Sequence, residues 1–186
     1  MATQKSLKPE RSDGELWRRF VNGDLSAFET IYNENFEKLY RYGMTLLPDE
    51  PVVKDCIQAL FIELWENVSN LSSIDQIRFY LLKALRNRIY NQLKAIKRRS
   101  SFLDNLSNQR LIGMEDASTE TGDRFGNESD LRTVINELPM RQREAIMLIF
   151  FEGYTYEAAS EVLSINIQSL YTLVSRAVAN LRANLK

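Results

Sequence analysis

The residues with the clearest chemical potential form a basic run in the middle of the chain. Seven Lys and Arg side chains lie between Leu81 and Ser100, with no acidic residue among them: Lys83, Arg86, Arg88, Lys94, Lys97, Arg98 and Arg99. Cations along one helix can bind successive phosphates, because each neutralised phosphate of a nucleic acid releases condensed counterions. A solvated helix face is the ordinary alternative, and the lack of any interrupting acid favours phosphate binding.

A second set of polar side chains occurs near the C-terminus, between Thr155 and Leu181. The apolar spacing predicts a helix-turn-helix, with the small Ser160 where the helices approach and Ile165 in the turn. The outward residues of its second helix are then Gln168, Ser169, Tyr171, Thr172, Ser175 and Arg176. A helix fits the major groove, where Gln and Arg pair with bases and Ser, Thr and Tyr suit phosphates. Taken alone, this stretch also fits two packed helices without a DNA role.

Composition argues against an enzyme. The 186 residues include no His and one Cys, so neither a His–Cys metal cluster nor a triad with a His base is available. We find no Gly-rich phosphate loop before a helix, and therefore predict no enzymatic activity, no cofactor and no metal. Cys56 is expected to be a small buried hydrophobe. A single Cys, no signal peptide and no long apolar run favour a cytoplasmic protein without membrane insertion.

The elements that must position these residues are predicted to be helices only. The chain has few Gly and Pro (7 and 4), and its apolar residues recur at threes and fours. Helices are expected at Asp13–Asn22, from a cap at Asp24 to about Leu47, after Pro51, and from a cap at Asp75. These four make one bundle over residues 12–99. Residues 100–127 lose the pattern and are predicted to be a flexible linker, with a helical turn near Phe102–Leu111.

A second all-α domain of four helices is predicted over residues 128–186, ending in the helix-turn-helix. Thr155 and Asn166 are the expected caps of the last two helices, and Gly153 is the expected end of the helix before them. Acidic and basic residues nearly balance between Glu128 and Lys186, so this domain is expected to bind DNA weakly by itself.

Several stretches resemble sigma factors of bacterial RNA polymerase, and they occur in the family's order. Asp24–Tyr32, Asp55–Trp65 and Tyr80–Arg88 look like parts of region 2, including its polymerase-binding and promoter-melting helices. Glu137–Glu144 and Glu152–Glu157, followed by Ser175–Ala177 and Leu181-Arg182, look like region 4. Two regions joined by a short linker resemble the minimal layout of the extracytoplasmic-function (ECF) group.

The resemblance implies a mechanism and its partners. Region 2 would bind the clamp of core RNA polymerase, melt promoter DNA and take a flipped base of the −10 element. Region 4 would contact the polymerase flap and place its last helix at the −35 element. An anti-sigma factor is a further partner implied by resemblance alone.

The resemblance also supplies candidate site residues. Polymerase contacts are expected at Asp55, Gln58, Ile62, Glu63, Trp65 and Glu66, while Phe61 and Leu64 are expected in the core. The loop Asn67–Ser73 lies where the family takes a flipped base, and its candidates are Asn67, Asn70 and Ser72. Asn87 joins the seven basic side chains on the melting helix.

The chain departs from the family pattern at a few positions. Ser164 stands where a turn Gly is usual, and a left-handed backbone there costs a non-Gly residue free energy. Tyr171 and Leu173 stand where the family often has Lys and Arg, which removes two candidate phosphate contacts from the reading helix.

Two alternatives to a sigma factor stay open. A stand-alone helix-turn-helix regulator would bind DNA as a dimer without polymerase, and would not need the basic region 2. A degenerate sigma-like protein that titrates a regulator would fit the weakened basic character at Tyr171 and Leu173.

Overall fold

The computed structural model describes residues 12–71, 73–107 and 126–185, and those residues form helices and connecting turns with no strand. The N-terminal domain contains α1 (Asp13–Val21), α2 (Leu25–Leu46), α3 (Glu50–Glu66), the short 3-10 helix η1 (Val68–Asn70) and α4 (Ile77–Ser107). The C-terminal domain contains α5 (Gly126–Glu137), α6 (Met140–Ile146), the π-helical turn η2 (Met147–Phe151), α7 (Tyr156–Leu163) and α8 (Ile167–Asn184). The predicted all-α fold with two four-helix domains is confirmed.

Side chains at the predicted positions start several of these helices. The Asp24 carboxylate accepts hydrogen bonds from the backbone N–H groups of Ser26 and Ala27, which caps α2 as expected. Thr155 and Asn166 cap α7 and α8 in the same way. These oxygens satisfy N–H groups that have no partner inside the helix. Side-chain hydrogen bonds from Ser26 and Arg19 lower the pKa of Asp24 to about 2, so its carboxylate stays charged.

Helix α4 has a cap that comes from another helix. The Ile77 N–H donates to Asp13 Oδ2 at 2.9 Å, so the first turn of α1 stabilises the start of α4. We expected Asp75 to be the cap, but the helix begins two residues later, at Ile77. Since the capping bond joins residues 64 positions apart, no local sequence pattern announces it.

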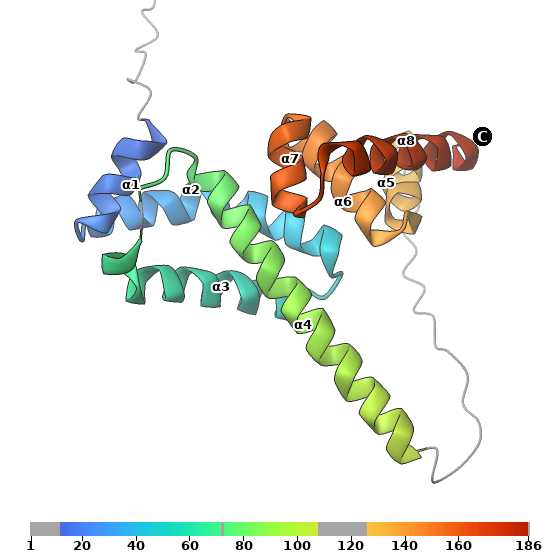
Figure 1. Cartoon of the computed structure of the whole chain (residues 1–186), viewed down its shortest axis with the longest axis horizontal. Helices are drawn as coiled ribbons and strands as arrows, with labels where there is room; N and C mark the ends of the chain where they lie inside the picture. The colour runs from blue at the N-terminus through green and yellow to red at the C-terminus, as the bar shows by residue number, and fades with distance from the viewer. Residues whose placement is uncertain (1–11, 72, 108–125, 186) are drawn as a thin grey trace, which may run out of the picture.

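The core of the N-terminal domain is aromatic at one end and aliphatic at the other. Trp17 and Phe20 of α1 are buried against Phe28 and Tyr80, with ring centroids 5.3–5.5 Å apart. Gly43 allows α2 and α3 to approach closely, because a Cβ there would lie 2.6 Å from Val53 Cγ1. Helix α4 crosses over α2 and α3 on this core (Figure 1).

Helix boundaries differ from the expectation in two places. Helix α4 continues to Ser107, so residues 100–107 are helical where we expected a flexible linker to begin. The expected turn near Phe102–Leu111 falls partly on this extension, and residues 108–125 lie outside the described structure. The helix expected to run from Met140 to Phe150 changes to π-helical hydrogen bonding at Met147, which leaves Phe150 and Phe151 exposed.

The two domains pack against each other. One cluster of buried side chains includes Tyr42 and Leu46 of α2 together with Ala145, Leu148 and Ala159 of the C-terminal domain. Figure 1 shows the C-terminal helices lying against α2 and α4, with the last turns of α4 extending away from both domains. No local pattern of residues predicts this docking, because the contacting residues lie far apart along the chain, as Tyr42 and Glu144 do at 102 positions.

Candidate nucleic-acid interface

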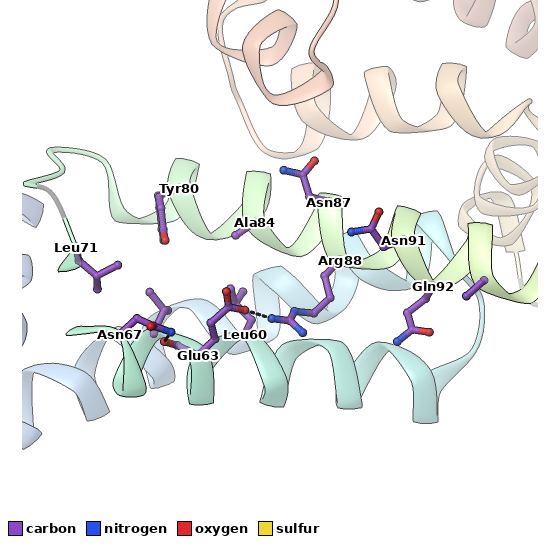
Figure 2. Close-up of a pocket in the computed structure, with 12 residues that line it drawn as sticks. Leu60, Glu63, Asn67, Leu71, Tyr80, Ala84, Asn87, Arg88, Asn91 and Gln92 are labelled. Carbon is purple, nitrogen blue, oxygen red and sulfur yellow. Dashed lines mark hydrogen bonds and ion pairs between the residues drawn. The ribbon is translucent and has the colours of Figure 1, made fainter. Parts of the chain in front are cut away.

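A polar groove of about 680 Å³ runs between α3 and α4. Figure 2 shows Tyr80 and Gln92 pointing from α4 toward α3, with Asn67 and Leu71 at the end of the groove. The amide side chains at its rim and walls are Asn67, Asn87, Asn91 and Gln92. Amides both donate and accept hydrogen bonds, so they suit the edges of an unstacked nucleobase.

Arg88 and Glu63 form an ion pair across this groove, and the dashed line in Figure 2 marks it. Arg88 therefore has a carboxylate partner within the domain. Glu63 in turn points toward α4, and its side chain is still 62% exposed. Burial, followed by the Glu63 charge, raises the pKa of Tyr80, so its hydroxyl remains a hydrogen-bond donor at neutral pH.

An exposed basic face adjoins the groove on α4. At about 100° per residue, Lys83, Asn87, Lys94 and Arg98 share one side of the helix. Lys94, Lys97 and Arg98 are exposed, and Lys83 is half-buried with its ammonium 5.9 Å from the centroid of the Phe79 ring. Asn70 and Arg99 have side chains outside the described set, and Ser72 lies outside the described residues altogether.

Arg86 does not belong to this exposed face. Its residue is 9% exposed, and its Nε donates to Glu144 Oε1 at 2.6 Å across the domain boundary. In this arrangement its guanidinium is engaged by Glu144 and only 10% of its side chain is accessible to a phosphate. A signal for this was present in the sequence, since Arg86 lies four residues after Leu82 and three before Ile89, inside the apolar stripe of its helix.

The predicted polymerase contacts of α3 divide between two faces. Asp55, Gln58, Ile62, Trp65 and Glu66 are exposed on one side of the helix, and Ile62 and Trp65 are 49% and 39% exposed. Glu63 lies on the other side, in the polar groove. Phe61, Leu64 and Cys56 are buried, as predicted.

Helix α2 completes an apolar groove with this face of α3, and its residues were not among the predicted polymerase contacts. Leu25, Phe28 and Tyr32 line the groove of about 390 Å³ together with Ile62 and Trp65. Leu25 is 66% exposed, and its spacing of three and seven residues from Phe28 and Tyr32 was the available signal. An exposed apolar patch of this kind on a helical domain is typical of a protein-binding surface.

The reading helix α8 presents the side that the sequence predicted. Gln168, Ser169, Tyr171, Thr172, Ser175 and Arg176 are all exposed, while Leu170 and Val174 are buried. The ring of Tyr171 stacks on that of Tyr156 at 4.4 Å, which fixes the direction of the phenol. Ser164 adopts the left-handed conformation expected for this turn, with φ 53° and ψ 46°.

Family models match most of the two domains. A model for sigma-70 region 2 matches residues 31–99, and a model for sigma-70 region 4 matches residues 128–181. The chain is 25% identical over 176 residues to the ECF RNA polymerase sigma factor SigK of Mycobacterium bovis (strain BCG / Pasteur 1173P2), covering 90% of both chains. It is 24% identical over 156 residues to the RNA polymerase sigma factor SigZ of Bacillus subtilis (strain 168), covering 83% of this chain and 84% of SigZ.

Solved structures share the fold. The sigma factor RpoE in its complex with the anti-sigma factor NepR from Bartonella quintana superposes with a TM-score of 0.67 at 22% identity, covering 87% of this chain and 98% of RpoE. CnrH, in its complex with the cytosolic domain of CnrY, gives a TM-score of 0.66 at 19% identity, covering 94% and 97%.

The helix-turn-helix, the basic α4 and the matched regions define a sigma factor of RNA polymerase. With regions 2 and 4 in this order, the chain belongs to the ECF group of the sigma-70 family. Sigma factors are transcription initiation factors that direct core RNA polymerase to promoters, and they do so by binding and not by enzymatic catalysis. Among the described residues, none of the helices combines the length and the hydrophobicity that a membrane span requires.

Proposed function

We propose that this sigma factor uses three separate surfaces: the apolar groove of α2 and α3 for core polymerase, the polar groove and basic face of α4 for the −10 element, and α8 for the −35 element. Within region 2 the division of labour rests on chemistry. The apolar groove exposes Leu25, Ile62 and Trp65 and suits a protein helix, whereas the polar groove carries amides beside cations.

The polar groove is the observation that carries the −10 assignment. A flipped base needs hydrogen-bonding groups and a partly enclosed site, and Asn67, Tyr80 and Gln92 supply both between α3 and α4. The exposed Lys94 and Arg98 lie on the adjoining face, where they can bind the backbone of the displaced strand.

Region 4 acts at the −35 element through the exposed side of α8. Gln168 and Arg176 are the side chains that can read base edges, and Ser169, Tyr171 and Thr172 suit phosphates. The exposed Phe150 and Phe151 give this domain an apolar surface for the polymerase flap. The chain is not an enzyme and works in the cytoplasm. An anti-sigma factor restrains it, a partner supported by the complex of the similar RpoE with the anti-sigma factor NepR.

Transcription in a purified system tests this assignment. Core RNA polymerase with this chain is expected to form open complexes and run-off transcripts on a subset of a promoter library, whereas core alone gives none. A helix-turn-helix regulator would instead bind DNA tightly without polymerase, and that result would contradict the proposal. A chain that folds but neither binds core nor DNA would favour the degenerate sigma-like protein.

Point variants in the same assay can distinguish the role of the apolar groove from the role of the polar groove. Gln92→Ala is expected to leave polymerase binding intact and to weaken open-complex formation, because Gln92 points into the polar groove. Gln58→Ala removes an equal amide from the polymerase side of α3 and is expected to do the opposite, weakening polymerase binding without a separate defect in melting.

A further inference from the structure

A buried polar cluster joins region 2 to region 4. Glu144 of α6 is 0% exposed, and its Oε1 accepts hydrogen bonds from Arg86 Nε at 2.6 Å and from Tyr42 Oη at 2.7 Å. Its Oε2 accepts from Tyr90 Oη at 3.1 Å, and from Arg86 Nη2 at 3.5 Å. The Arg86 guanidinium also lies over the Tyr90 ring, 4.4 Å from its centroid. Among the described residues, each donor recorded for this carboxylate belongs to region 2.

The pKa directions agree with an ionised pair. Burial lowers the pKa of Arg86, but the Glu144 carboxylate outweighs burial and raises it. Burial and then the Glu144 charge raise the pKa of Tyr42 well above its usual range and also raise that of Tyr90, so both phenols remain donors.

Four further contacts join the two domains. Arg78 of α4 pairs with Glu152, whose side chain is 4% exposed, and the Arg78 guanidinium lies 5.6 Å from the centroid of the Tyr154 ring. Phe79 packs edge-on against Tyr154. Arg143 Nη1 donates to the Thr45 carbonyl at 3.2 Å. These contacts extend the interface on both sides of Glu144, whose own side chain is fully buried.

A buried ion pair of this kind fixes geometry more than it adds affinity. The cost of removing both charges from water offsets much of their attraction, whereas leaving one of them buried and unpaired is strongly unfavourable. When the domains separate, both charges regain water. The interface is consequently specific in orientation and still open to competition from a partner that binds the separated regions.

We propose that the Arg86–Glu144 pair is an intramolecular latch that holds the free sigma factor in a silent form. The carboxylate of region 4 occupies the guanidinium fork that Arg86 would otherwise present to a promoter phosphate, since Arg binds carboxylate and phosphate with the same donors. This regulation rests on the proposed function of region 2 at the −10 element. Core polymerase opens the latch by binding the separated regions, which then exposes Arg86.

The reading side of α8 supports a latch that acts on region 2. All six of its candidate contacts stay exposed in the docked arrangement, whereas Arg86 is covered. Docking therefore covers the DNA-binding side chain of Arg86 and restricts the position of α8 relative to region 2. The reading side of α8 itself stays exposed.

A distance measurement on the full chain tests whether the latch holds the domains. Spin labels at Glu34→Cys and Ala179→Cys, both at exposed positions, report region 2 against region 4 in a Cys56→Ala background. The parent is expected to give one narrow distance distribution. Glu144→Lys, which opposes Arg86, is expected to give a broad and longer one. Glu137→Lys makes the same charge change at an exposed site of region 4 and is expected to behave as the parent.

The functional arm compares the same variants for core binding. A closed state that holds most molecules weakens apparent affinity by the open fraction, so Glu144→Lys is expected to bind core polymerase at least about tenfold more tightly. Tyr42→Phe with Tyr90→Phe removes two donors without adding charge and is expected to shift both readouts in the same direction. If Glu144→Lys loses its helical circular dichroism and is therefore misfolded, the Tyr42→Phe, Tyr90→Phe double variant tests the latch in its place.

The outcomes are distinguishable from a failure of the proposed function. Unchanged distances in both latch variants would overturn the latch, as would open domains with unaltered core binding. If the parent gives no transcript with core polymerase, the proposed function fails, while the distance measurement still reports whether Glu144 holds the two domains together.

Discussion

At the scale of single residues, Arg86 shows what a run of basic residues can and cannot predict about the structure. The run from Lys83 to Arg99 predicted a cationic helix, and Lys94, Lys97 and Arg98 do lie exposed on α4. The same run could not reveal that Arg86 meets Glu144, because the two residues are 58 positions apart and belong to different domains. Its place among Leu82, Leu85 and Ile89 was the one local sign of burial.

Ile62 offers a direct test of the apolar groove. Ile62→Asp places a charge in the middle of the patch formed by Leu25 and Trp65, and is expected to weaken binding to core polymerase at least about tenfold, as loss of a central interface anchor does. Thermal stability should change little, since Ile62 is 49% exposed. Leu185→Asp, at a comparably exposed position near the end of the chain, is the control for core binding measured by fluorescence anisotropy.

Asp24 links stability to pH. Its pKa is lowered to about 2 from a usual value of 3.8, so the folded state favours the carboxylate, and this contribution is complete above pH 4 and is lost as the pH falls through about 2. Asp24→Asn keeps a good cap but lacks the charge that binds Arg19. We expect the variant to melt at a lower temperature than the parent at pH 7, and the difference to shrink steadily between pH 4 and pH 2. A difference that stays constant across this range would show that the charge contributes nothing.

At the scale of elements, sequence spacing and caps predicted the helices well. Asp24, Thr155 and Asn166 start helices where expected, and Ser164 ends α7 in the left-handed conformation that the turn needs. The start of α4 could not be placed in the same way, because its cap is Asp13 of α1. The π-helical turn at Met147–Phe151 also escaped prediction, since the hydrophobic pattern there fits an α-helix equally well.

The turn between α7 and α8 yields a stability prediction. Ser164 has φ 53°, a conformation that is unfavourable for a residue with a Cβ. Ser164→Gly is expected to stabilise the protein by about 0.5–1 kcal/mol, the gain in the turn being partly offset by the greater freedom of Gly in the unfolded chain. Urea unfolding measures it, with Ser175→Gly in the middle of α8 expected to destabilise.

The exposed basic face of α4 gives a prediction about promoter melting. Lys94→Glu with Arg98→Glu reverses two charges beside the polar groove and is expected to abolish open complexes, because the displaced strand loses phosphate contacts. Permanganate reactivity of unpaired thymines measures melting, and co-elution with core polymerase is expected to be unchanged. Lys38→Glu with Arg41→Glu, on α2, makes an equal charge change and is expected to leave melting intact. Full melting by the α4 variant would contradict the assignment of this face.

At the scale of the whole molecule, the two regions behave as one body in this structure. The buried cluster that includes Tyr42, Leu46, Ala145 and Leu148 crosses the domain boundary, and the Glu144 carboxylate accepts hydrogen bonds from Tyr42, Arg86 and Tyr90 of region 2. Sequence motifs predicted each region separately but did not predict that the two regions pack against each other. Docking depends on side chains that read as ordinary core or surface residues in either region alone.

Unfolding cooperativity follows from this shared core. Because neither region can separate without exposing apolar side chains and the charged cluster, the parent is expected to unfold in a single calorimetric transition, with equal calorimetric and van't Hoff enthalpies. Glu144→Lys uncouples the regions and is expected to give two transitions, at least one of them below the parent's Tm, while Glu137→Lys keeps one. Two transitions in the parent would mean that the interface adds little free energy, and region 4 would then be free to leave region 2 before any partner binds.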